Sequence, residues 1–140
     1  MKSLRTLLKI AERDLETLRR ALADQIGKEA NVIQRIHGHE QTIRAEQKLA
    51  QRDYESARAY GGYAVAALAV RKALDAEKVL IGQEIDRLRT LITEAHVEAR
   101  KFERLIELEE VREKAKREKR ENEELDEFAT LRAGRQRGPA

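Results

Sequence analysis

The chain contains no cysteine and no tryptophan, and its single proline stands at position 139 of 140. Without cysteine, disulfides and thiolate metal ligands are excluded, and the redox compartment cannot be inferred. Aromatic residues make up only 4% of the chain, so the large rings that fill compact cores are nearly absent. These shortages argue against a compact globular core.

Long apolar runs are also missing. No run reaches the 18 residues that a membrane span needs. The first thirteen residues carry charges every few positions, so they lack the apolar stretch of a secretory signal. We therefore expect a soluble, cytoplasmic protein.

Charged residues are abundant, at 39% against about 25% in ordinary domains. They stand among Leu, Ile, Val, Ala and Gln, a mixture rich in strong helix formers and typical of coiled coils. The formal net charge of +3 is accounted for by Arg132, Arg135 and Arg137 near the C-terminus. The remaining charges are balanced, which favours solvated helix faces over a nucleic-acid surface.

Residues 3–58 predict one long helix with an apolar seam. Two interleaved series have a spacing of seven, and this 3.5-residue period indicates supercoiling against another helix. One series is apolar at seven of eight positions, and comprises Leu8, Leu15, Leu22, Glu29, Ile36, Ile43, Ala50 and Ala57. The other is apolar at four of eight, and comprises Leu4, Ala11, Leu18, Gln25, Val32, His39, Glu46 and Asp53.

The adjacent pair Gly61-Gly62 is the strongest helix-breaking feature of the chain. Two glycines readily supply the backbone conformations that a reversal needs. We therefore place a turn at residues 59–63.

Residues 64–132 predict a second helix. Its seam is apolar at all nine positions: Leu74, Ile81, Ile85, Leu88, Ile92, Ala95, Ala99, Phe102 and Ile106. Further apolar residues widen this stripe beyond a strict two-helix seam: Leu91, Leu105, Leu108 and Val111.

Past this seam, thirteen of the sixteen residues 112–127 are charged. Such a helix has nothing to bury and must project into solvent or into a partner. Leu125, Phe128 and Leu131 then form a short apolar ridge with a spacing of three. We expect Ala133-Gly134 to end the helix and residues 133–140 to form a basic tail. The ridge is either part of a frayed tail or a docking element, and we favour the second.

Together these features predict an all-α protein, a single domain folded as a long two-helix antiparallel coiled-coil hairpin. A turn at Gly61-Gly62 pairs residues whose numbers sum to about 123, so that Leu22 faces Phe102 and Ile36 faces Leu88. Because the two seams are of similar length and can cover each other, we expect a monomer in isolation.

No catalytic, cofactor or metal site is expected. His37 and His39 diverge on a helix, no phosphate-binding glycine motif is present, and the carboxylate pairs lie in open charged helix. By contrast, all three tyrosines, Tyr54, Tyr60 and Tyr63, fall near the expected turn, followed by the apolar residues 65–70. These residues form either a binding surface or a small cluster packed within the tip.

The sequence Asn-Glu-Glu-Leu-Asp-Glu-Phe-Ala at residues 122–129, between a charged helix and a basic tail, resembles the flagellar export FliJ family. The leucine-rich and charged N-terminal helix, the tyrosines at mid-chain and the total length agree with this resemblance. The alanine- and glycine-rich tip departs from the family's pattern.

The resemblance implies a two-helix coiled coil similar to the central stalk of rotary ATPases. Its paired termini would insert into the hexameric ring of the flagellar export ATPase and promote ring assembly. It would also contact the export gate protein in the membrane and escort substrate chaperones, working in the cytoplasm beside the inner membrane. The residues expected to dock into the ring are Arg5, Arg13, Leu125, Asp126, Glu127, Phe128, Leu131 and Arg132. Those expected to bind the gate or chaperones are Tyr54, Tyr60, Tyr63, Leu68, Val70 and Leu74.

Two alternatives remain open. One is the equivalent stalk of a virulence type III secretion system, and the other is a structural coiled-coil spacer or adaptor that pairs with another chain through the widened stripe. An enzyme is the least favoured reading.

Overall fold

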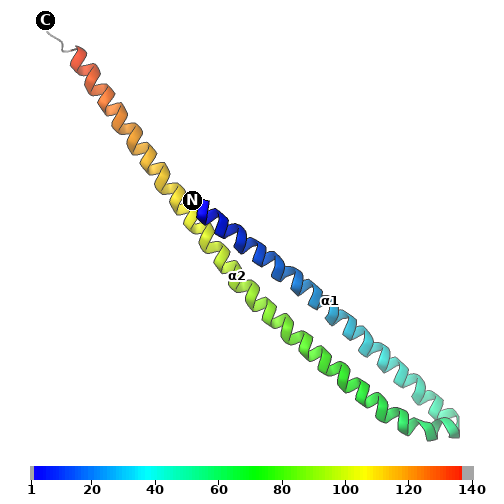
Figure 1. Ribbon diagram of the computed structural model, residues 1–140. Coiled ribbons are helices and arrows are strands. Elements are labelled where there is room, and N and C mark those ends of the chain that lie inside the picture. The colour runs from blue at the N-terminus through cyan, green and yellow to red at the C-terminus, as the bar shows by residue number, and fades with distance from the viewer. Residues whose placement is uncertain (1, 137–140) are drawn as a thin grey trace. The chain divides into compact units, whose positions relative to one another are not determined.

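The computed structural model describes residues 2–136. Helix α1 spans Lys2–Arg52 and helix α2 spans Tyr54–Gln136 (Figure 1). The helices are antiparallel, because Arg5 near the start of α1 pairs with Glu110 and Arg35 farther along α1 pairs with Glu77. The predicted all-α, two-helix antiparallel coiled-coil hairpin is confirmed.

The described residues fall into two compact units. We call residues 13–95 the hairpin unit, and residues 2–12 together with 96–136 the terminal unit. Each is described separately below. The single-domain organisation expected from the sequence stays a prediction.

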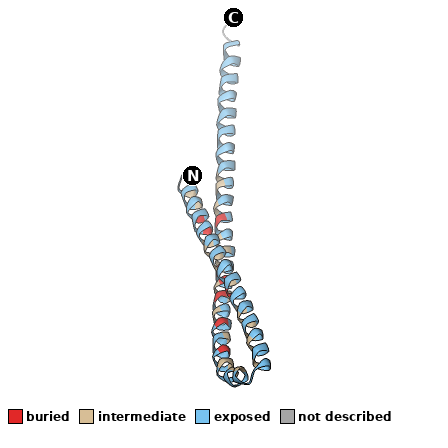
Figure 2. Ribbon diagram, turned by 90° about the vertical axis from the view of Figure 1, so that its right-hand side faces the viewer, coloured by how far each residue is buried: buried red, intermediate tan, exposed pale blue. Residues whose placement is uncertain are grey.

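The predicted apolar seams are confirmed. Fourteen of the sixteen positions in the two N-terminal series are buried or half-buried, and the exceptions are Asp53 and Ala57 at the turn. All nine positions of the C-terminal seam are likewise buried or half-buried (Figure 2). The heptad period therefore identified the contact face of both helices.

The best-buried side chain of the hairpin unit is Val32, which is 1% exposed and packs with Ile81 and Ile85. Leu22 and Ile36 pack against this cluster. The predicted register, which placed Ile36 against Leu88 and Leu22 against Phe102, was therefore wrong. The residue numbers of two interhelical ion pairs give the actual register: they sum to 112 for Arg35–Glu77 and to 111 for Glu40–Arg71, whereas the predicted register required about 123.

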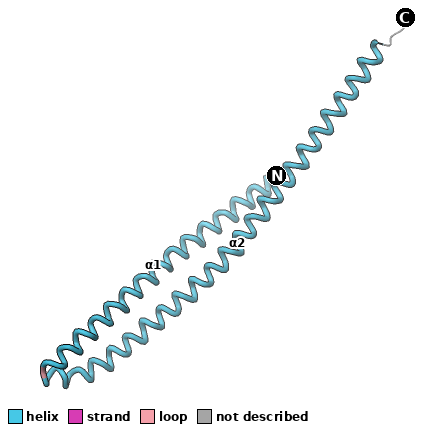
Figure 3. Tube along the Cα trace, turned by 180° about the vertical axis from the view of Figure 1, so that it is seen from behind, coloured by secondary structure: helices cyan, strands magenta, loops and turns pink. Residues whose placement is uncertain are grey.

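The register is different because the turn comes earlier than predicted. Only Asp53 separates the two helices (Figure 3), so the predicted turn at residues 59–63 and the predicted start of the second helix at residue 64 were wrong. Gly61 and Gly62 lie inside α2, and neither has a positive φ angle. Glycine permits a left-handed backbone but does not require it.

Asp53 determines the turn because it caps the N-terminus of α2. Its carboxylate accepts hydrogen bonds from the Glu55 N–H at 3.2 Å and the Ser56 hydroxyl at 3.5 Å. Its carbonyl accepts the first helical bond, from the Ala57 N–H at 3.0 Å. An Asp N-cap satisfies backbone donors that would otherwise lack partners and complements the positive end of the helix dipole.

The C-terminal end of α2 also differs from expectation. The helix continues through Ala133 and Gly134 to Gln136, so the boundary at residue 132 was four residues too early. A single glycine weakens a helix by only about 1 kcal/mol and need not end it. The remainder of the predicted basic tail, residues 137–140, lies outside the described residues.

Within residues 2–136, neither helix combines the length and the apolar character that a membrane crossing requires.

Candidate docking surfaces

The apolar ridge of the terminal unit is fully accessible. Leu125, Phe128 and Leu131 are 65%, 64% and 67% exposed. They belong to a longer segment, residues 110–136 of α2, in which every residue is exposed (Figure 2). The interhelical seam of this unit ends at Ile106 and Glu109, which are half-buried. The ridge therefore belongs to a helix without a covering partner helix.

Charged side chains border this ridge. Asp126, Glu127 and Arg132 are exposed, and Asp126, Glu127, Thr130 and Leu131 line a shallow surface depression. The Thr130 hydroxyl donates to the Asp126 backbone carbonyl at 2.8 Å and not to the Asp126 carboxylate. Within residues 2–136, no ion pair engages the carboxylates of Asp126 and Glu127, which lie beside the ridge.

The two predicted docking arginines of α1 are separated by the division into units. Arg5 lies in the terminal unit, where its guanidinium is 3.5 Å from Glu110. Both side chains are more than half exposed, so this pair contributes at most about 1 kcal/mol. Arg13 is exposed and belongs to the hairpin unit.

The widened stripe of α2 is largely uncovered. Leu105, Leu108 and Val111 are 46%, 42% and 64% exposed, whereas Leu91 in the hairpin unit is half-buried. On α1 of the terminal unit, Leu7 and Ile10 are also exposed, at 43% and 50%. Heptad arithmetic places Leu7 and Leu105 on the same flank of the seam. This unit therefore has a second apolar surface besides the ridge.

The residues of the predicted tip surface differ in their exposure within the hairpin unit. Tyr54 is 80% exposed, and Leu68 and Val70 are 57% and 49% exposed. Tyr60 and Tyr63 are half-buried, and their ring centroids lie 6.1 Å apart at a tilt of 37°. The tip thus contains both a small local aromatic cluster and exposed apolar side chains.

The prediction that Leu74 belongs to this surface was wrong. It is 6% exposed and lies in the interhelical seam. A docking partner could not reach its side chain without separating the helices.

Polar contacts across the helices of the hairpin unit were not predicted. The His39 imidazole Nε2 donates to the Ala67 carbonyl at 2.9 Å. Arg71 donates across the helices to Glu40 at 2.5 Å, and it also donates within α2 to Asp75 at 3.1 Å. The hydrogen bond from Arg71 holds the pKa of Glu40 below its ordinary value, and the same bond raises that of Arg71. The interhelical contacts depend on the register of the two helices, and the predicted register was wrong because the turn was predicted too late in the sequence.

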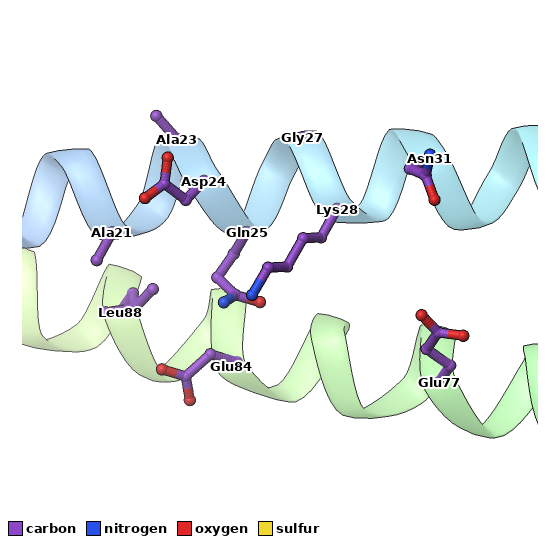
Figure 4. A pocket seen from close by; sticks show the side chains of 10 residues that line it. All are labelled: Ala21, Ala23, Asp24, Gln25, Gly27, Lys28, Asn31, Glu77, Glu84 and Leu88. Carbon is purple, nitrogen blue, oxygen red and sulfur yellow. The ribbon is translucent and has the colours of Figure 1, made fainter.

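A shallow groove lies between the helices of the hairpin unit (Figure 4). Gln25 and Lys28 extend from α1 towards α2, Glu77 rises from α2 towards α1, and Glu84 points to the side. Glu77 is paired with Arg35 at 3.0 Å, and Arg87 donates to Glu84 at 2.6 Å. The bond from Arg87 keeps the pKa of Glu84 below its ordinary value. Both carboxylates are thus engaged in surface ion pairs.

Within the described part of the chain, no three His, Asp or Glu side chains are grouped as a metal site would require.

Comparison with known protein families, with curated proteins and with solved structures found no match to this chain.

Proposed function

We propose that this chain is a non-enzymatic coiled-coil stalk of the flagellar type III protein export apparatus. It inserts its terminal unit into the hexameric export ATPase ring and promotes assembly of that ring. The observation that supports this proposal is the ridge Leu125, Phe128 and Leu131. These side chains are about two-thirds exposed, on a part of α2 that extends beyond the interhelical seam. The family resemblance of residues 122–129 supplies the identity of the ring.

The unpaired helix has the properties of an inserting element. Residues 113–136 measure about 36 Å at 1.5 Å per residue. Isolated helices are marginal in water, and most helical stability in proteins comes from packing. Dense charges of both signs keep this segment solvated, while the ridge supplies the apolar contact that a ring collar would cover.

Binding energy in such an interface concentrates in a few side chains, with aromatic residues prominent. Phe128 is the only aromatic residue of the unpaired segment and is the expected anchor. Asp126, Glu127 and Arg132 would orient it, and Arg5 and Arg13 would meet the ring farther out. No cofactor takes part.

The exposed residues at the tip are suited to contact the export gate and the chaperones. Tyr54, Leu68 and Val70 present apolar surface, and the Tyr60–Tyr63 pair adds the accessible parts of two rings. We place the protein in the cytoplasm, at the export apparatus beside the inner membrane.

The exposed stripe of Leu105, Leu108 and Val111 favours one alternative, a structural spacer or adaptor that pairs with another chain. A stalk of a virulence type III system would use the same ridge on a different ATPase. Neither alternative requires catalytic residues.

The test is to measure ATP hydrolysis and hexamer formation by the export ATPase with and without the added chain. We expect stimulation by the wild-type chain, and a loss of most of it with Phe128→Ala. The matched control is Val111→Ala, because Val111 and Phe128 are each 64% exposed. An equal loss with both variants, or none with either, contradicts the proposal.

A further inference from the structure

The side of α2 that faces away from α1 in the hairpin unit is apolar over several turns. Val65, Leu68, Val79 and Leu80 are 72%, 57%, 58% and 66% exposed, and Ala69 and Ala76 between them are exposed as well. We call the surface comprising Val65, Leu68, Ala69, Lys72, Asp75, Ala76 and Val79 the outer face.

Helical geometry places Val65 and Val79 away from the interhelical seam, whereas Leu68 and Asp75, each one residue after the buried Ala67 and Leu74, lie on its flank. Val65 and Val79 each stand two residues before a seam residue, Ala67 and Ile81, and are therefore turned about 200° around the helix from it. Ala67 and Ile81 are 7% and 9% exposed. A helix that is apolar on both sides is normally covered on both sides, so the outer face requires a second occupant.

The residues of the outer face follow a heptad of their own. Val65, Lys72 and Val79 are seven apart and form one series, while Leu68 and Asp75 form the other. In an antiparallel coiled coil, residues of one series pack against the other series of the partner helix. The outer face of a second copy can pack in this way when the numbers of the two residues that face each other sum to 147.

In that register the face is complementary to itself. Leu68 packs against Val79 of the second copy, and Lys72 meets Asp75 of the second copy. Because the arrangement has twofold symmetry, each of these pairs occurs twice. Ala69 and Ala76 flank the same layers with small side chains, which allow the helices to approach closely.

We infer that the outer face of α2 is a self-association surface, through which two copies of this chain form an antiparallel dimer with Lys72 of each copy paired to Asp75 of the other. The Arg71 Nε hydrogen bonds to Asp75, at 3.1 and 3.3 Å, leave room for a further donor. A polar layer within an apolar interface fixes the register at some cost in affinity. The hairpin seams alone predict a monomer, and this surface gives that monomer a concentration-dependent route to a dimer.

The first test is the solution mass of the full chain over a range of concentrations. We expect the mass to rise from that of one 16.1 kDa chain towards twice that value. Lys72→Asp opposes two carboxylates and should weaken the dimer about tenfold or more. The double variant Lys72→Asp with Asp75→Lys restores opposite charges and should recover most of that loss.

Lys48→Glu is the matched control, because it reverses an exposed lysine on α1 and should leave the dimer unchanged. Circular dichroism of each variant shows whether the hairpin is intact. A chain that stays monomeric at every concentration, or a double variant no tighter than Lys72→Asp, overturns the inference. If a different protein occupies this face instead, the isolated chain stays monomeric at every concentration.

Cross-linking tests the orientation. Because the chain has no cysteine, Leu68→Cys and Val79→Cys each introduce a unique thiol. Mixed and oxidised, the two variants should form a disulfide-linked heterodimer. Leu68→Cys alone should not cross-link, because Leu68 opposes residue 79 and lies eleven residues, about 16 Å, from its own counterpart, beyond disulfide reach. Cross-linking of Leu68→Cys alone indicates a parallel pair and contradicts the inference.

Discussion

The imidazole Nε2 of His39 lies 2.9 Å from the backbone carbonyl oxygen of Ala67, across the two helices of the hairpin unit. His39 occupies a seam position that an aliphatic residue would ordinarily fill, and Ala67 is 7% exposed. A polar side chain in a seam costs stability but restricts the register. The hydrogen bond explains how the seam accommodates it.

Replacing His39 with alanine removes this bond together with the packing of the ring. We expect the free energy of unfolding to fall by about 1–2 kcal/mol, since one net hydrogen bond contributes about 0.5–1.5 kcal/mol. His39→Leu should retain the packing and be at least as stable as the wild type. Urea denaturation monitored by helicity distinguishes the two, and a His39→Leu chain as unstable as His39→Ala would contradict this account.

Gly61 and Gly62 provide a direct check on where the chain turns. Both lie within α2, and a Cβ added to either meets no atom within 4 Å. The double variant Gly61→Ala with Gly62→Ala should therefore stabilise the helix, by about 1 kcal/mol for each substitution. A lower melting temperature would show that the glycines serve the turn after all.

Asp53→Ala should have the opposite effect. It removes the acceptor of the Glu55 N–H and the Ser56 hydroxyl, and loss of an Asp N-cap costs about 1 kcal/mol. Asp53→Asn keeps a capping oxygen and is the matched control. Thermal melting should rank wild type and Asp53→Asn above Asp53→Ala, and three equal melting temperatures would argue against the cap.

The Glu40–Arg71 pair predicts a pH dependence of stability. The hydrogen bond from Arg71 lowers the folded-state pKa of Glu40 from its ordinary value of 4.5. A lowered carboxyl pKa contributes stability above the unfolded-state pKa, and that contribution is lost as the pH falls through the folded-state pKa. The wild type should therefore melt above Glu40→Gln at about pH 7, and the gap should narrow as the pH falls below 4.5. A gap that does not change with pH would show that the pair makes no pH-dependent contribution.

The helical class, the antiparallel pairing and the seam residues were predictable, because a 3.5-residue period from Leu4 to Ile106 allows few other structures. The turn was not. Gly61-Gly62 looked decisive because glycine permits reversal, yet a single Asp that caps a helix was sufficient. The signal was present as Asp53 followed by Ser56, two residue types typical of helix N-termini.

Exposure was harder to predict than pairing. The ridge at Leu125, Phe128 and Leu131 could be identified because the seam ends well before it. Leu74 was assigned to the seam by its heptad position and to the tip surface by the family resemblance, and its 6% exposure supports only the seam. The outer face was missed because the uninterrupted apolar run at residues 65–70 shows no period from which a buried and an exposed side can be separated.

The central claim is that the terminal ridge docks into an ATPase ring and contributes little to the fold. Truncation after Glu124 tests it most directly, because this change removes the ridge and leaves both seams intact. Every residue removed within the described part of the chain is exposed, so the melting temperature should be nearly unchanged, as for other exposed sites with effects of about 0.5 kcal/mol. Stimulation of the export ATPase by the truncated chain should be lost. Stimulation that survives the truncation, with the hairpin still folded, would contradict the account.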